Sequence, residues 1–153
     1  FSKFFGCFKR LLGFIMNFKL LNILLIPAFI GTSQVASAQA LLSDFQVKSE
    51  IEAFLQGSVF PRQIDALTTL TSMQNFGVRG LQYNYTLDLN ISDMGGDAQV
   101  EIAKNTMINI VKNSFCTNPA MVWYKTNFVE LKYVYDDSTN SRIFEFRINP
   151  NDC

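Results

Sequence analysis

Eleven consecutive residues, from Leu81 to Ile91, alternate strictly between apolar and polar side chains. Successive side chains of a β-strand point to opposite faces, so this pattern predicts a strand with one buried and one solvated face. A sheet with one solvated face is usually antiparallel. Tyr83 and Tyr85 lie on the apolar side, and aromatic residues there are more often core than a stacking platform for sugar or nucleic acid.

The last third of the chain has the pattern of a β-hairpin. Residues 129–135 and 144–148 alternate in the same way, and the polar residues 136–141 connect them. Four charged residues fall on the opposite face: Glu130, Lys132, Glu145 and Arg147. Exposed cross-strand charge pairs there contribute little stability. A further strand is predicted over 64–73, which is rich in β-branched threonine.

Helical spacing of apolar residues predicts two longer helices. The first begins after Ser43 or Asp44 and ends near Gly57. The second has Asp97 as its N-cap and continues to Phe115.

A short third helix is predicted from Asn118-Pro119, which has the form of an N-cap followed by proline at the first helical position, to about Asn127. Cys116 would lie in the turn between the second and third helices. The order of elements predicts one α+β domain, a four-stranded antiparallel sheet with helices packed on one face.

The first forty residues differ in charge from the rest of the chain. They contain four basic residues and no acid, whereas the remaining 113 residues carry 9 − 13 = −4. Residues 16–40 have the three zones of a signal peptide, with an apolar run from Leu20 to Ile30 and small residues that permit cleavage after Ala38 or Ala40. The alternative, a membrane anchor, is disfavoured because this run is shorter than the roughly 20 residues that span a bilayer.

Residues 1–15 precede this leader. We interpret them as an upstream region translated by mistake, or as a basic amphipathic extension that meets anionic lipid. Residues 41–153 then form the single mature domain, and its expected location is the periplasm or outside the cell.

Export also determines the expected state of the cysteines. Cys7 lies before the cleavage site, which leaves Cys116 and Cys153 in an oxidising compartment, where two thiols are expected to form a structural disulfide that closes the domain. The chain contains no histidine, so imidazole metal sites and His-dependent catalysis are excluded, and no metal or other cofactor is expected.

Five short segments follow one another along the mature domain: Phe60-Pro61-Arg62-Gln63-Ile64-Asp65, Tyr83-Asn84-Tyr85-Thr86-Leu87, Cys116-x-x-Pro119-x-Met121, Tyr133-Val134-Tyr135-Asp136 and Asp152-Cys153. Together they resemble a family of small exported proteins of Gram-negative bacteria. Its members carry Leu-Pro-x-x-Val-Asp, Tyr-x-Tyr-Thr, Cys-x-x-Pro and Tyr-x-Tyr-x-Asp segments and end in Cys. The resemblance implies export, a helix-covered sheet and a Cys116–Cys153 bridge, but no catalytic residue.

The sequence departs from the family at two places. Arg62 and Gln63 replace residues that are usually apolar. Asn127 stands where the family has a glycine before the penultimate strand, and Asn tolerates a left-handed conformation.

These observations favour a non-catalytic binding or envelope-assembly protein over an enzyme. Pro61, Arg62, Gln63 and Asp65 are the expected contact residues, because they combine a rigid turn with polar groups that packing does not require. The expected partner is a protein of the cell envelope. An acidic domain disfavours nucleic acid, and membrane contact is expected only through the uncleaved leader.

Two alternatives remain open. One is a secreted inhibitor or immunity-type protein. The other is a hydrolase that cleaves cell-envelope glycan with carboxylates drawn from Asp65, Asp88, Asp136 and Asp137.

Overall fold

The computed structural model of the chain describes residues 41–153. The predicted leader, its cleavage site, Cys7 and residues 1–15 lie outside this range. The helices are α2 (Asp44–Gln56), α3 (Asp97–Thr117) and α4 (Val122–Thr126), with short 3-10 helices at Ile91–Met94, Pro119–Met121 and Pro150–Asp152. The strands are β1 (Arg62–Gln63), β2 (Thr68–Asn75), β3 (Gly80–Leu87), β4 (Glu130–Asp136) and β5 (Arg142–Ile148). The α+β class is confirmed.

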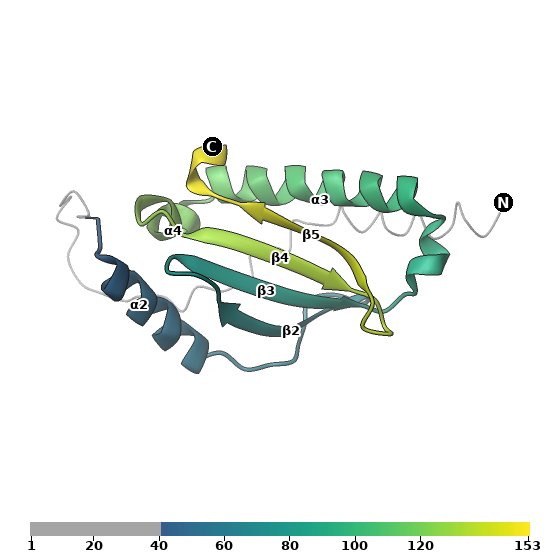
Figure 1. Cartoon of the computed structure of the whole chain (residues 1–153), viewed down its shortest axis with the longest axis horizontal. Helices are drawn as coiled ribbons and strands as arrows, with labels where there is room; N and C mark the ends of the chain where they lie inside the picture. Colours follow the sequence, from purple (N-terminus) through teal and green to yellow (C-terminus); the bar gives the residue numbers. More distant parts are fainter. Residues whose placement is uncertain (1–40) are drawn as a thin grey trace. The chain divides into compact units, whose positions relative to one another are not determined.

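The prediction of four antiparallel strands is wrong in two respects. The sheet has five strands in the order β1-β2-β3-β4-β5, and β3 and β4 run parallel while the other neighbours are antiparallel (Figure 1). Between β3 and β4, the helices α3 and α4 return the chain to the end of the sheet where β3 begins. A strand that starts from the same end as its neighbour is parallel to it.

The fifth strand arises because the predicted segment 64–73 forms a turn and not a continuous strand at its start. β1 and β2 pair on either side of this turn, with Arg62 opposite Leu70 and Gln63 opposite Thr69. β3 also ends earlier than predicted, at Leu87, so that Ile91 begins a 3-10 helix that stops at Gly95 with φ 86°.

Two rows of aromatic rings cross strands β3, β4 and β5 on one face of the sheet. Tyr83, Tyr133 and Phe146 are directly opposite one another, with successive ring centroids 5.2 Å apart. Tyr85, Tyr135 and Phe144 form the second row, with centroids 4.9 Å apart. Burial raises the pKa of each of the four tyrosines above its ordinary value. The prediction that Tyr83 and Tyr85 belong to the core is therefore confirmed.

The opposite face carries the predicted charge pairs. Lys132 Nζ lies 3.1 Å from Glu145 Oε1, and Arg147 Nη1 lies 3.2 Å from Glu130 Oε1. The hydrogen bond from Lys132 is the main cause that lowers the pKa of Glu145. Arg147 also lies over the ring of Phe76, 5.3 Å from its centroid.

The helices begin largely as the sequence predicts. Ser43 caps α2, which buries Val47 and Ile51 and contacts β2. The N-cap of α3 is Gly96 and not Asp97, because φ at Gly96 is 96°, where glycine is favoured, and Asp97 lies in the first turn.

The contacts of α3 are with β5, whose apolar side chains are buried while Glu145 and Arg147 are exposed, so α3 packs on the aromatic face. Asn118 caps the turn that leads into α4, as predicted. Across residues 41–153, no helix is both long enough and apolar enough to span a bilayer.

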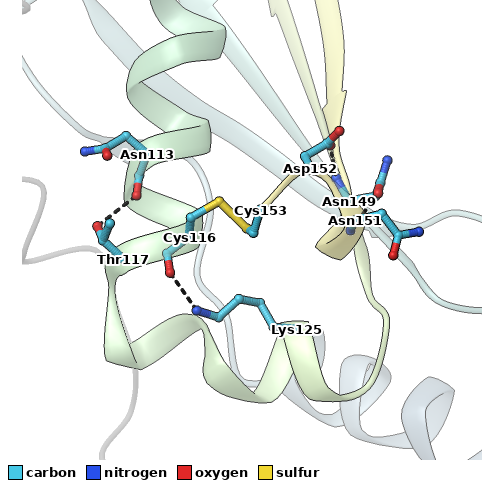
Figure 2. The surroundings of a disulfide bond; sticks show 8 residues. All are labelled: Asn113, Cys116, Thr117, Lys125, Asn149, Asn151, Asp152 and Cys153. Carbon is cyan, nitrogen blue, oxygen red and sulfur yellow. Dashed lines mark hydrogen bonds between the residues drawn. A yellow bond between two sulfur atoms is a disulfide. The ribbon is translucent and has the colours of Figure 1, made fainter.

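The predicted disulfide between Cys116 and Cys153 is present (Figure 2). Cys116 lies in the last turn of α3 and not in the following turn, because α3 continues to Thr117. The bond holds the C-terminal 3-10 helix, which Asn149 caps, against the end of α3. Lys125 of α4 donates to the Cys116 carbonyl at 2.8 Å, so three segments meet at this point.

Candidate functional site

The four predicted contact residues all lie in the hairpin formed by β1 and β2. Asp65 Oδ1 accepts hydrogen bonds from the backbone N–H groups of Leu67 and Thr68, each at 2.8 Å. Gln63 Nε2 donates to the Asp65 carbonyl at 2.7 Å. A carboxylate that accepts from the backbone two and three residues ahead replaces the bonds of a tight turn. Asp65 and Gln63 therefore shape the hairpin, a role that the sequence analysis did not assign to them.

Arg62 differs from these two residues. Its side chain is half-buried, and it has no hydrogen-bond or ion-pair partner within residues 41–153. Pro61 next to it is exposed. Of the four predicted residues, Arg62 has the polar group that the hairpin itself does not use.

The carboxylates of the hydrolase alternative have structural roles at three of four positions. Asp65 shapes the turn, and Asp136 Oδ1 lies 2.5 Å from Arg142 Nε. Asp137 is buried, 2% exposed, and accepts from Thr139, Ser141 and Ile91. These bonds, led by the one from the Thr139 hydroxyl, lower the pKa of Asp137 to about 2. The bonds of Asp137 therefore hold the β4–β5 connection in place, and a carboxyl group with a lowered pKa is a poor proton donor at neutral pH.

A second site, which the sequence analysis missed, centres on Arg79 in the loop between β2 and β3. Its guanidinium donates to Asp44 Oδ1 at 2.6 Å, to the Leu42 carbonyl at 2.7 Å and to the Asn127 carbonyl at 2.5 Å. The side chain of Asn127 also bonds to Leu42, since Asn127 Oδ1 accepts a hydrogen bond from Leu42 N at 3.1 Å. We call these four residues the Arg79 junction. Its hydrogen bonds join residues that are 35 to 85 positions apart, so no local pattern in the sequence could have indicated it.

Four exposed apolar residues are next in sequence to members of the Arg79 junction. We call them the apolar rim: Leu41 (58% exposed), Phe45 (81%), Val78 (53%) and Phe128 (54%). Single large apolar side chains at such exposure are common, but four of them next to residues that are bonded to one another indicate an interaction surface.

Phe128 has an uncommon backbone conformation, with φ 51°. The expectation that Asn127 would be left-handed is not met, since φ of Asn127 is −97°. The side chain of Asn127 is buried and bonded at both ends, to Leu42 N and to the Trp123 carbonyl, so the reversal of the chain occurs one residue later. A bulky residue in this region is a backbone outlier, and such outliers concentrate at functional sites.

We searched residues 41–153 for side chains that could bind a metal ion together. No group of three or more Cys, Asp or Glu side chains there is placed to hold a metal ion. The arrangement of both sites suits binding through charge and apolar contact.

Comparison with known proteins shows the fold. No family model and no curated protein sequence matches this chain. Among solved structures, a candidate secreted protein from Pseudomonas aeruginosa is similar, with a TM-score of 0.58, 17% sequence identity, and coverage of 80% of this chain and 99% of that protein. EpsS, a pilotin of the type 2 secretion system of Vibrio vulnificus, is similar with a TM-score of 0.52 and 6% identity, over 72% of this chain and 90% of the pilotin. At these identities the likeness concerns the fold alone.

Proposed function

We propose that the protein is an exported, non-catalytic binding protein that joins a protein partner in the cell envelope, and that the β1–β2 hairpin is its contact surface. The observation that carries this proposal is the state of Arg62. Its charge lies on a hairpin held by the bonds of Asp65 and Gln63, and no carboxylate of residues 41–153 forms an ion pair with it.

A rigid hairpin favours binding because little conformational entropy is lost when it docks. Arginine is enriched among the residues that contribute most to protein interfaces, since its planar group forms paired bonds with carboxylates. The partner surface is therefore expected to offer an acidic side chain opposite Arg62 and apolar contact for Pro61.

The comparisons support the same kind of role. A pilotin of a secretion system shares the fold, and a candidate secreted protein shares it over nearly its full length. We extend to this chain an assembly role in the envelope and a location in the periplasm or outside the cell, together with membership of the exported family whose five segments it resembles.

The test is capture of partners by the tagged protein after export, with wild type compared with Arg62→Ala and Arg62→Glu. Both variants should lose the partner, and the charge reversal should lose it more completely. Arg142→Ala is the matched control, because Arg142 also lies in an edge strand of the sheet but is already paired with Asp136 and Glu145. All three variants should unfold like wild type.

Retention of every partner at full strength by Arg62→Glu would overturn the assignment of the hairpin. The identity of the captured protein distinguishes an assembly factor from the inhibitor alternative. If the partner is an enzyme or a toxin whose activity falls on binding, the protein is an inhibitor and not an assembly factor.

A further inference from the structure

The Arg79 junction clamps the point at which the N-terminal forty residues join the domain. Both backbone polar groups of Leu42 are bonded, its N–H to Asn127 Oδ1 at 3.1 Å and its carbonyl to Arg79 Nη2 at 2.7 Å. The side chain of Asp44, at the start of α2, is held by the same guanidinium. The backbone of Leu42 is therefore held by residues of two other segments, Arg79 and Asn127.

The residues of the apolar rim are next in sequence to the residues that meet at this point. Leu41 is the residue directly before the clamp, and Phe45 lies in the first turn of α2 with 81% of its surface exposed. Val78 and Phe128 adjoin Arg79 and Asn127, the other two segments of the junction. Each bonded segment of the junction therefore has at least one exposed apolar side chain beside it.

The chain before Leu41 indicates what covers the apolar rim. Its apolar run ends at Ile30, and ten residues, Gly31 to Ala40, connect this run to the clamp. Ten residues span at most about 35 Å even when fully extended. While the leader is attached and inserted in lipid, the bilayer surface is therefore within reach of the apolar rim.

We propose that the apolar rim is a lipid-facing surface, through which the domain lies against the membrane from which its leader emerges. Aromatic and aliphatic side chains of this kind bury themselves at the boundary between headgroups and acyl chains. This contact is additional to the leader, through which alone the sequence analysis expected the protein to meet a membrane.

The test uses the full chain in vesicles of phosphatidylethanolamine and phosphatidylglycerol, where no peptidase removes the leader. With Cys7 replaced by serine and the Cys116–Cys153 bond intact, a single cysteine is introduced by Phe45→Cys, Phe128→Cys or Val59→Cys and labelled with an environment-sensitive fluorophore. Val59 is the matched control. It is 82% exposed, like Phe45, but lies beyond the other end of α2, about 20 Å away along a helix of 13 residues.

Labels at positions 45 and 128 should shift to shorter wavelength and be quenched by brominated acyl chains, and the label at 59 should not. Equal quenching at all three positions would overturn the proposal, and so would no quenching at any. If labels at 45 and 128 are already shielded without vesicles and do not change when lipid is added, the chain itself covers the apolar rim and the proposal fails.

A second measurement separates the apolar rim from the leader. With the label at Leu41→Cys, the double variant Phe45→Ser, Phe128→Ser should lose most of the quenching, whereas undiminished quenching would show that the leader alone brings Leu41 to the lipid. Arg62→Glu should leave quenching unchanged. In the sheet, Arg62 lies opposite Leu70 near the start of β2, whereas Val78 follows the other end of that strand. Failure of the proposed protein interaction is thereby distinguishable from failure of lipid contact.

Discussion

Replacement of Arg79 by alanine should destabilise the domain more than replacement of any surface arginine. Arg79 joins the segment before α2 to the residue after α4 through two bonds to backbone carbonyls, those of Leu42 and Asn127. Only 22% of its side chain is exposed, so these carbonyls are largely shielded from water that could replace the lost donor.

The size of the effect follows from the three partners. A hydrogen bond that involves a charged group contributes about 1.5–3 kcal/mol, so two bonds at the lower limit give about 3 kcal/mol. The ion pair with Asp44 adds little, about 0–1 kcal/mol, because 67% of that carboxylate side chain is exposed. A loss of about 3 kcal/mol lowers the ratio of folded to unfolded protein roughly a hundredfold.

The assay is urea unfolding of the purified protein followed by fluorescence of Trp123, the single tryptophan of the chain. Trp123 lies in α4, which ends at the junction residue Asn127, so its fluorescence follows the unfolding of this part of the domain. Asp44→Ala should cost less than about 1 kcal/mol. Arg142→Ala is the control, because Arg142 is 48% exposed and forms two ion pairs at the surface.

A loss for Arg79→Ala no larger than the loss for Arg142→Ala would refute this reasoning. It would mean that water or a rearranged loop satisfies the two carbonyls. The assumption that the clamp at Leu42 is rigid would then fail as well.

Three further predictions concern stability. Replacing Cys116 and Cys153 by serine opens a loop of 38 residues and should cost about 4 kcal/mol in urea unfolding, while Cys7→Ser should cost nothing. The pKa of Asp137 in the folded state is lowered from 3.8 to about 2, so the stabilisation that its ionised carboxylate gives the fold should be complete above pH 3.8 and disappear as pH falls through 2. In Asp137→Asn, the free energy of unfolding measured across this pH range should not show this fall. Phe128→Gly should raise the thermal midpoint and stabilise by up to about 1 kcal/mol, since φ is 51°, and an unchanged or lower midpoint would contradict the strain at this residue.

The elements that could be predicted are those whose signal lies within a few residues. The alternation around Tyr83 and Tyr85 identifies a strand with one buried face, and it also identifies which face is buried. Ser43 and Asn118 mark helix starts because the capping bond is made to the next turn. The Cys116–Cys153 bond could be predicted for a different reason, because the predicted removal of the leader leaves only two cysteines to pair.

Boundaries were predicted less well where a neighbouring contact competes with the pattern. The alternation continues to Ile91, but β3 ends at Leu87 because the backbone of Asp88 bonds to Leu67 and Ile91 N bonds to Asp137. In the same way Asp65 has the appearance of a free polar group in the sequence, and only its bonds to Leu67 and Thr68 show that it shapes a turn.

The sequence by itself therefore determined the class of the domain, the buried faces of its strands and the partners of its disulfide. The class and the buried faces follow from periodicity, which is a local property, and the disulfide partners follow from the number of cysteines that remain after the predicted leader. Only the tertiary structure decided that β4 runs parallel to β3, that Phe128 takes the left-handed conformation and that Arg79 holds Leu42, Asp44 and Asn127 together. These features depend on contacts between residues tens of positions apart, where the direction of a returning chain and the needs of buried polar groups outweigh local preference.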